Sequence, residues 1–337
     1  MSATSTRRWS PAVVRETEQV AEGVRRIAFE PETGTARVAV PPGSHLDVAV
    51  RVHGRPDVRS YSLLTAGRDR DRLTVAVRLD PHGRGGSAYL WSLRPGARVR
   101  VTQPLQGFPL LYDRPQYVLL AGGIGITALV GMAERLAARG ADFRFVYTGR
   151  RRAVMPFVDA LEEAYGARLR VVESEREGHL DVPGLVADCG GGTEMYVCGP
   201  GGLRDAVRRA WSEQEHPHSS LRFETFGSGG RWAPEPFRVR IPRLGIETVV
   251  PENASMLEAL QRAGADLMYD CRKGECGLCV ATVLEAEGAL DHRDVFLSTA
   301  QQERGNTVLT CVSRMVSRRT AAVGEGAAEG SLAIDVP

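Results

Sequence analysis

Hydrophobic and polar residues alternate over most of the first hundred residues. The alternation is clearest over residues 38–40, 45–50, 73–77 and 97–101, and glycine or proline separates these segments. A period of two is typical of strands that bury one face, and short strands divided by turns are typical of antiparallel sheets. The pattern predicts an antiparallel β-barrel for residues 1–112.

The pattern then changes. Residues 117–121 form an unbroken apolar run, which is followed by a glycine-rich turn and by a helical pattern that stops at Gly140. Apolar runs recur at residues 143–147 and 194–197. Apolar runs of this length indicate buried strands, and strands that alternate with helices are typical of an α/β fold. Residues 113–226 are therefore predicted to form a Rossmann-like α/β domain.

The last hundred residues mix short strands with a short helix. Strands are predicted at residues 238–242, 247–250 and 280–284. A helix is predicted over residues 255–264, ending at a glycine. Residues 237–337 are thus predicted to form an α+β domain, and the glycine- and proline-containing segment 227–236 is predicted to be a linker. Such a linker is compatible with a last domain that moves relative to the rest of the chain and with one that is packed in a fixed position.

The overall composition is that of an ordinary globular protein. Of the 337 residues 43% are hydrophobic and 25% charged, and the net charge is +2, which gives no sign of a nucleic-acid-binding surface. No apolar run reaches the roughly 18–20 residues that span a bilayer, and the first residues lack the apolar core of a signal peptide. A cytoplasmic location and a monomeric state are expected. Residues 237–337 carry a net charge of −3, so the rest carries +5, which fits either an acidic last domain on a basic body or simple scatter.

Four of the six cysteines gather near the C-terminus. They follow the spacing C-x4-C-x2-C with a fourth cysteine well downstream, and they are Cys271, Cys276, Cys279 and Cys311. This is the spacing of plant-type [2Fe–2S] ferredoxins, and two glycines between the cysteines would let the chain wrap closely around a cluster. The alternatives are a structural zinc site, which more often uses two C-x2-C pairs, or unliganded thiols. Cys189 is expected to be an inert buried thiol.

A glycine-rich motif lies between the first predicted strand and helix of the middle domain. From Gly123 it reads G-x-G-x-x-A, which allows a pyrophosphate to approach a helix N-terminus closely. A later predicted strand runs into a second group of small, turn-forming residues, and ligands bind along that edge of open α/β sheets. The residues predicted to bind the dinucleotide at these two places are Gly122, Gly123, Gly125, Ile126, Thr127, Cys198, Gly199 and Pro200.

Arginines follow the second predicted strand of the middle domain, at Arg150, Arg151 and Arg152. NAD-binding sites place an acidic residue here to hold the ribose 2′-hydroxyl, whereas arginine suits the 2′-phosphate of NADPH. Arg150 and Arg151 are therefore predicted to bind the coenzyme, with NADPH favoured over NADH. The alternative is a solvated basic turn.

Two polar clusters interrupt the predicted barrel. One offers a cation, an aromatic ring and hydroxyl groups, from Arg59, Ser60, Tyr61 and Ser62. The other precedes a short predicted helix and contains Gly85, Gly86 and Ser87. Backbone N–H groups at such a turn suit a phosphate, and the first cluster suits a planar, hydrogen-bonding ring. Either string alone is typical of an ordinary loop, but the two together, upstream of a dinucleotide domain, favour a flavin site.

With these motifs in this order, the chain resembles the iron–sulfur flavoprotein reductases represented by phthalate dioxygenase reductase and vanillate demethylase reductase. The matching strings, besides the cysteine loop, are residues 59–63, 83–87, 104–110, 121–127, 198–200, 223–226, 291–294 and 311–314. The resemblance implies an FMN-binding barrel, an NAD(P) domain and a C-terminal β-grasp ferredoxin domain. It implies FMN rather than FAD.

The resemblance also implies individual roles. The flavin contacts would be Arg59, Tyr61 and Ser62, and the phosphate contacts Gly85, Gly86 and Ser87. Phe226 would lie near the isoalloxazine or nicotinamide ring, and Cys198 would line the nicotinamide pocket. The chain departs from the family at Ala128, where many relatives have proline, and at Arg151, where NADH-using relatives often have a small or acidic residue.

The implied function is that of the reductase component of an oxygenase system. Electrons would pass from NAD(P)H through FMN and the cluster to a terminal oxygenase, with a Rieske non-haem iron enzyme as first choice and a cytochrome P450 as second. The acceptor would dock on an exposed face around Arg272, Lys273 and Glu275. The cofactors carry the chemistry, so no catalytic side chain is predicted. A stand-alone flavin or quinone reductase and a redox-sensing module are the alternatives.

Overall fold

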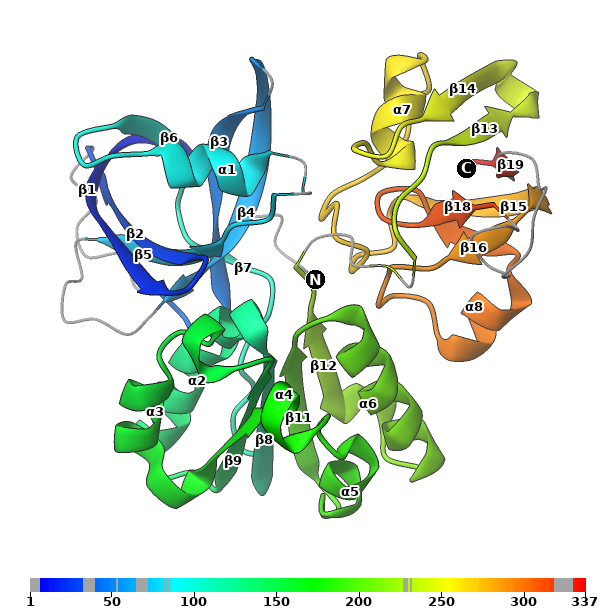
Figure 1. Cartoon of the computed structure of the whole chain (residues 1–337). Coiled ribbons are helices and arrows are strands. Elements are labelled where there is room, and N and C mark those ends of the chain that lie inside the picture. The colour runs from blue at the N-terminus through cyan, green and yellow to red at the C-terminus, as the bar shows by residue number, and fades with distance from the viewer. Residues whose placement is uncertain are drawn as a thin grey trace. The chain divides into compact units, whose positions relative to one another are not determined.

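The computed structural model describes residues 7–32, 40–52, 54–64, 72–81, 83, 85–226, 230, 232–317 and 330–337. The chain divides into two compact units, Met1–Glu224 and Thr225–Pro337 (Figure 1). None of the helices in the described ranges is long and apolar enough to cross a membrane.

The first unit begins with a closed antiparallel barrel, drawn from blue to cyan in Figure 1. Its strands follow the order β4-β5-β2-β1-β6-β3-β7, and β3 also pairs with β4, which closes the sheet. The strands are β1 (Trp9–Ala21), β2 (Val24–Pro31), β3 (Ser44–Val52), β4 (Arg55–Leu64), β5 (Leu73–Arg78), β6 (Arg98–Thr102) and β7 (Leu105–Gln106). The helix α1 (Gly86–Ser92) follows β5. The predicted barrel is confirmed.

The alternation in the sequence has a clear structural counterpart. On β3, for example, Leu46, Val48 and Val50 are buried and join one apolar cluster inside the barrel. The predicted strands at 45–50 and 73–77 lie in β3 and β5, and the predicted strand at 97–101 lies in β6 except for its first residue. Residues 38 and 39 of the remaining predicted strand lie outside the described residues.

The rest of the first unit is a parallel sheet in the order β10-β9-β8-β11-β12. Its strands are β8 (Gln116–Gly122), β9 (Phe143–Gly149), β10 (Leu169–Glu173), β11 (Thr193–Cys198) and β12 (Leu221–Glu224). The helices are α2 (Ile126–Ala138), α3 (Val158–Tyr165), α4 (Ser174–Glu177), α5 (Val182–Ala187) and α6 (Gly201–Glu213). Short 3-10 turns are η1 (Gly123–Gly125), η2 (Arg152–Val154), η3 (Gly166–Arg168) and η4 (His218–Ser220).

Two apolar clusters cover the faces of this sheet. Residues of α2 and α3 pack in one cluster, and residues of α5 and α6 pack in the other. The inner strand β11 is buried along its whole length, because helices cover both of its faces. This accounts for the unbroken apolar runs and confirms the Rossmann-like α/β fold.

The second unit combines a mixed sheet, β14-β13-β19-β15-β17, with a small pair, β16-β18. Its strands are β13 (Phe237–Ile241), β14 (Ile246–Val250), β15 (Val280–Glu287), β16 (Ala289–Asp291), β17 (Thr307–Leu309), β18 (Arg314–Val316) and β19 (Ser331–Asp335). Its helices are α7 (Met256–Arg262), α8 (Thr299–Arg304) and the 3-10 turn η5 (Pro242–Leu244). A capping box between Ser255 and Glu258 begins α7. The predicted α+β fold is confirmed.

Candidate functional site

The order of the parallel sheet reverses at β8, since β9 and β10 lie on one side of it and β11 and β12 on the other. Ligands of open α/β sheets bind at the carboxyl ends of the strands beside such a switch point. The glycine-rich turn η1 follows β8, and residues 198–200 follow β11. Cys198 pairs with Ala121 in the register of these two strands. The structure therefore brings the two predicted dinucleotide motifs together.

Glycine is required where these two loops meet. A Cβ atom on Gly125 would lie 2.1 Å from the carbonyl oxygen of Cys198, and one on Gly199 would lie 3.0 Å from Cα of Gly122. The backbones thus approach more closely than any side chain would allow. Pro200 borders the same contact, 2.6 Å from a Cβ atom built on Gly122.

Two other residues of the motif are engaged within the protein. Ile126 is fully buried, and the hydroxyl of Thr127 donates a hydrogen bond of 3.0 Å to the carbonyl oxygen of Ile124. Both residues therefore hold the turn in shape. Direct contact of either with a dinucleotide stays a prediction.

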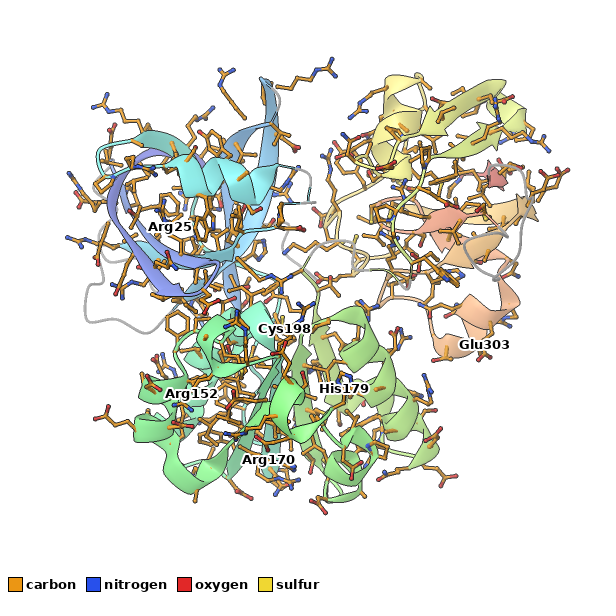
Figure 2. All side chains as sticks on the ribbon, in the orientation of Figure 1. Arg25, Arg152, Arg170, His179, Cys198 and Glu303 are labelled. Carbon is orange, nitrogen blue, oxygen red and sulfur yellow. The ribbon has the colours of Figure 1, made fainter. Side chains whose placement is uncertain are left out.

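A polar contact joins the barrel to the parallel sheet. The Ser62 hydroxyl on β4 donates a 2.9 Å hydrogen bond to Oε2 of Glu224 on β12, and both side chains are buried. Glu224 pairs in register with Cys198, whose side chain is 1% exposed, and Figure 2 shows Cys198 at the end of the sheet that faces the barrel. Ser62, Glu224 and Cys198 thus gather beside the switch point.

Glu224 was not predicted as a site residue, although it lies in one of the matching strings. In the sequence, Glu224 is one acidic residue that follows an apolar strand position. Acidic residues in that position are common on protein surfaces, so the sequence did not mark it as a site residue. Only its partner Ser62, which lies 162 residues earlier, reveals it as a buried member of the site. Phe226 belongs to the second unit, so its predicted place near the nicotinamide stays a prediction.

The two polar clusters of the barrel meet at Arg59. A Cβ atom on Gly86 would lie 2.7 Å from Cγ of Arg59, so the arginine side chain lies along the start of α1. Its Nη1 atom also pairs with the Asp57 carboxylate at 2.7 Å. Gly85, which precedes Gly86, has a positive φ of 79°. A cation and a glycine turn therefore lie side by side, which suits an anionic group such as a phosphate.

The other residues of these clusters have local partners. The Ser60 hydroxyl donates to Oδ1 of Asp47 over 2.5 Å, and the Ser87 hydroxyl accepts a 3.1 Å hydrogen bond from the backbone N–H of Asp80. Burial raises the pKa of the Tyr61 hydroxyl well above its ordinary value, so this ring stays neutral. Direct flavin contacts by these three residues stay predictions.

The arginines after β9 differ in their partners. Arg151 forms a two-pronged ion pair with Glu22, with Nη–Oε distances of 2.5 and 2.9 Å. Arg152 pairs with Asp159 and Glu162. Within the described ranges, no ion pair or side-chain hydrogen bond holds the exposed guanidinium group of Arg150. Arg150 is thus the better placed of the two predicted arginines to meet a phosphate.

The four cysteines of the second unit converge. The thiol of Cys311 hydrogen bonds to Cys271 and to Cys279, and Cys276 contacts Cys271. None of them forms a disulfide. No three His, Cys, Asp or Glu side chains of the described ranges are arranged to hold a single metal ion, but a [2Fe–2S] cluster needs only two thiolates for each iron. The thiol positions therefore fit such a cluster.

The backbone around Cys271 favours its thiolate. The N–H groups of Lys273, Glu275 and Cys276 each lie 3.4 Å from Sγ of Cys271. Together with the hydrogen bond from the Cys311 thiol, which has the largest effect, they lower the pKa of Cys271 to about 4. Thiolates are the form of cysteine that binds iron. The loop therefore favours the protonation state in which Cys271 can be a ligand of an iron–sulfur cluster.

Neighbouring residues fix the shape of the loop. A Cβ atom on Gly277 would lie 2.3 Å from the ring of Phe296, and one on Gly274 would lie 2.8 Å from Cα of Asp294. Both glycines have a positive φ, so glycine is needed for conformation and for space. Asp294 is fully buried and accepts a hydrogen bond of 2.8 Å from the N–H of Leu297. Asp294 lay in a matching string but had no predicted role.

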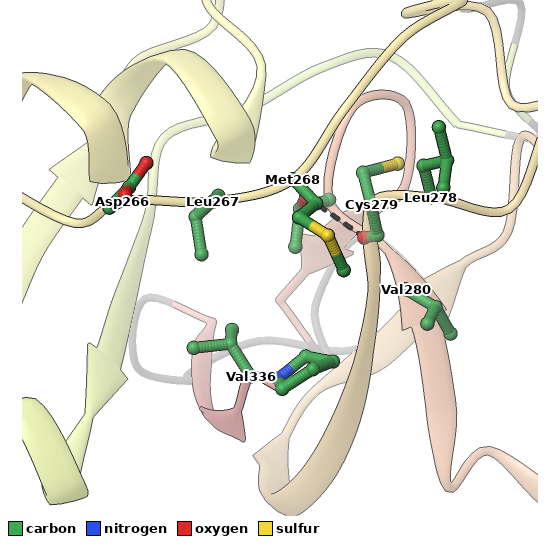
Figure 3. Close-up of a pocket in the computed structure, with 9 residues that line it drawn as sticks. Asp266, Leu267, Met268, Leu278, Cys279, Val280 and Val336 are labelled. Atoms are coloured by element: carbon green, nitrogen blue, oxygen red, sulfur yellow. Dashed lines mark hydrogen bonds between the residues drawn. The ribbon is translucent and has the colours of Figure 1, made fainter.

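The expected docking face needs a correction. Arg272 is exposed and Lys273 is half-buried, but the carboxylate of Glu275 is bound by Thr225. The prediction that all three charges are exposed is therefore confirmed for Arg272 and wrong for Lys273 and Glu275. The side chains that do project near the cysteines include Met268, 63% exposed, and Leu278, 46% exposed. Figure 3 shows both beside Cys279, around a shallow recess.

Comparisons with known proteins agree with this architecture. A family model described as an oxidoreductase FAD-binding domain matches residues 11–109, and one described as a 2Fe-2S iron–sulfur cluster binding domain matches residues 239–316. Tetrachlorobenzoquinone reductase of Sphingobium chlorophenolicum is 35% identical over 91% of this chain and 95% of its own. A structure of a self-sufficient cytochrome P450 monooxygenase superposes with a TM-score of 0.65 and 33% identity, over 97% of this chain but 41% of that one.

The similarity to phthalate dioxygenase reductase extends over nearly the whole chain. The enzyme of Burkholderia cepacia is 32% identical over 89% of this chain and 92% of its own. A solved structure of phthalate dioxygenase reductase superposes with a TM-score of 0.72 and 29% identity, over 97% of this chain and 98% of that one. The flavin-type barrel, the parallel sheet and the cysteine loop therefore belong to an oxidoreductase of the phthalate dioxygenase reductase family, with flavin-binding and [2Fe–2S]-binding domains.

Proposed function

We propose that this protein is the reductase component of an oxygenase system and passes electrons from NAD(P)H to a separate terminal oxygenase. The observation that carries the proposal is that one chain holds a flavin-type barrel, a dinucleotide sheet and a cysteine loop in the order of phthalate dioxygenase reductase. That structure is described as one for electron transfer from pyridine nucleotides to [2Fe–2S], and it aligns with 97% of this chain.

Flavin and cluster have complementary chemistry. When bound, a flavin would supply both two-electron exchange with a nicotinamide and one-electron exchange with a [2Fe–2S] cluster. The protein supplies binding and orientation. Ser62 and Glu224 fix the join between the barrel and the sheet, and the buried Cys198 lines the end of β11 where a nicotinamide would lie. Cys271, Cys276, Cys279 and Cys311 would hold the cluster.

Among flavins, FMN is the proposed cofactor. The family model that matches is named for FAD, so the choice rests on the resemblance to the FMN-dependent reductases and on the anion site at Arg59. A single terminal phosphate could lie between the Arg59 guanidinium and the backbone of Gly85 and Gly86. NADPH is the proposed coenzyme, and the exposed Arg150 supports this choice. Arg151 supports it less, because its guanidinium group is paired with Glu22.

The proposed acceptor is a Rieske non-haem iron oxygenase, with a cytochrome P450 as the second choice. The names of several relatives support an oxygenase of some kind, since one belongs to a phthalate dioxygenase system and one structural match is a P450 monooxygenase fused to such a reductase module. A cytoplasmic, monomeric protein stays a prediction.

Reconstitution tests this proposal. The cluster-loaded protein is mixed with NADPH or NADH and with purified oxygenase components of each type, and product formation is measured against coenzyme consumed. Product should form with one type and should require both proteins. Rapid reduction of the flavin with no electron transfer to any oxygenase would contradict the proposal.

A quinone reductase is the second candidate, because tetrachlorobenzoquinone reductase is 35% identical over 91% of this chain. In that case a substituted benzoquinone would be reduced with a catalytic efficiency well above that for oxygenase-coupled turnover. The two candidates also differ in whether the cluster is needed.

A further inference from the structure

The cluster-binding loop is held at a second place, apart from its cysteines. Thr225 donates its backbone N–H to Oε1 of Glu275 over 3.0 Å. The Thr225 hydroxyl lies 2.7 Å from the same oxygen and 2.9 Å from the backbone carbonyl oxygen of Lys273. A hydroxyl has one proton, so it donates to one of these acceptors at a time. The Thr225 side chain is buried, so water competes little for these contacts.

The two residues that Thr225 holds also face the predicted cluster. The backbone N–H groups of Lys273 and Glu275 each lie 3.4 Å from Sγ of Cys271. A hydrogen bond to the Lys273 carbonyl fixes the peptide plane that joins Lys273 to Gly274. Hydrogen bonds to the Glu275 side chain restrict the backbone from which its own N–H points at sulfur. Thr225 therefore holds the short backbone segment that lies between the Lys273 and Glu275 N–H groups, which are two of the three at Cys271.

We propose that Thr225 and Glu275 form a latch that positions residues 273–276 and so maintains the hydrogen bonds to the Cys271 sulfur. Both are positioning residues, since neither is a predicted ligand of the cluster. Hydrogen bonds to cluster sulfurs tune the reduction potential, because they stabilise the more negative, reduced form. The inference rests on the proposed function only in assigning Cys271 to a [2Fe–2S] cluster.

The competing explanation is that Thr225 merely satisfies a half-buried carboxylate. Such a role would affect folding stability but would leave the potential and the exchange of the loop amides unchanged. The latch predicts changes in both, and it predicts that the hydroxyl of residue 225, not its methyl group, is responsible.

The test compares Thr225→Val, which keeps the shape but loses the hydroxyl, with Thr225→Ser, which keeps the hydroxyl. Thr282→Val is the matched control, because Thr282 is exposed on β15 and its side chain has no hydrogen bond in the described residues. All variants are studied as full-length, cluster-loaded protein. The potential of the cluster is measured by redox titration followed by EPR, and amide hydrogen exchange is measured over residues 271–277.

Thr225→Val should lower the potential and should speed exchange of the loop amides about tenfold, as expected for losing one net hydrogen bond. Thr225→Ser and Thr282→Val should match the unaltered protein in both measurements. An unchanged potential and unchanged exchange in Thr225→Val would overturn the latch, as would equal changes in Thr225→Ser. Neither measurement uses an oxygenase, so failure of the latch is distinct from failure of the proposed function.

If Thr225→Val does not hold a cluster, a second pair of variants tests the latch by amide exchange alone. Glu275→Gln keeps an acceptor oxygen for Thr225, whereas Glu275→Ala removes it. The latch requires slow exchange over residues 271–277 in Glu275→Gln and fast exchange in Glu275→Ala. Equal exchange in the two variants would overturn it.

Discussion

Replacing Cys276 tests, at a single residue, whether the four cysteines bind a [2Fe–2S] cluster. Its sulfur lies beside Cys271, and its backbone N–H points at the Cys271 sulfur. Replacing Cys276 by alanine removes one of four predicted thiolate ligands but leaves the first unit untouched. The EPR signal of the reduced [2Fe–2S] cluster should disappear, whereas NAD(P)H should still reduce the flavin.

The matched control for this variant is Cys189→Ala. Cys189 is also buried, but it lies in the first unit after α5. It should keep both the EPR signal and flavin reduction. A normal cluster signal in Cys276→Ala would show that the ligand assignment is wrong.

Arg150 and Arg151 carry the second prediction at this scale. The two side chains differ in their partners, since Arg151 is paired with Glu22 and Arg150 is exposed. Arg150→Gln should raise the KM for NADPH about tenfold, which corresponds to one lost charge-assisted hydrogen bond, and should change the KM for NADH little. Arg151→Gln should have a smaller effect. Steady-state kinetics with both coenzymes measure this.

Glu22→Gln provides the converse experiment. It weakens the hold on Arg151 and so should lower the KM for NADPH, if the freed guanidinium reaches the 2′-phosphate. If each of the three substitutions changed the KM for NADPH and the KM for NADH equally, a 2′-phosphate site in the turn after β9 would be excluded. The exposed pair itself contributes little to stability, so folding should not obscure the result.

At the scale of elements, the close approach of two loops at the switch point is open to test. Gly125→Ala would place a Cβ atom 2.1 Å from the carbonyl oxygen of Cys198, so the turn after β8 must move. Overpacking of this kind costs roughly 1–3 kcal/mol, and the displaced turn should bind the coenzyme at least tenfold more weakly. Thermal unfolding and coenzyme titration measure the two effects.

Gly190→Ala serves as the control for that variant. A Cβ atom on Gly190 would meet no heavy atom within 4 Å, and its φ is not positive. It should leave coenzyme affinity unchanged. Normal affinity in Gly125→Ala would mean that the turn after β8 is not part of the coenzyme site.

Elements with strong local patterns could be predicted from the sequence, and elements defined by distant partners could not. The apolar runs of β8 and β11 and the capped helix α7 are local signals. In contrast, β19 lies in the middle of its sheet, between β13 and β15, although it comes last in the chain. Its short sequence gives no sign that two earlier strands leave a place for it.

The same distinction applies to the candidate site. The cysteine spacing and the glycine motif are encoded by neighbouring residues, so they could be located in advance. The roles of Glu224 and Glu275 depend on Ser62 and Thr225, which are distant in the chain, so burial and pairing were needed to find them. Charge alone led to the wrong expectation for Glu275.

At the scale of the whole molecule, the question is whether the second unit is needed for the physiological reaction. Deleting residues 237–337 removes all four predicted cluster ligands and keeps the barrel and the parallel sheet, which belong to the unit Met1–Glu224. The shortened protein should still oxidise NAD(P)H with an artificial acceptor such as ferricyanide, because the flavin is retained. It should lose all oxygenase-coupled turnover, because single electrons no longer leave through the cluster. If benzoquinone reduction survives the deletion at the full-length rate and oxygenase coupling is absent in both proteins, the quinone reductase function is the correct one.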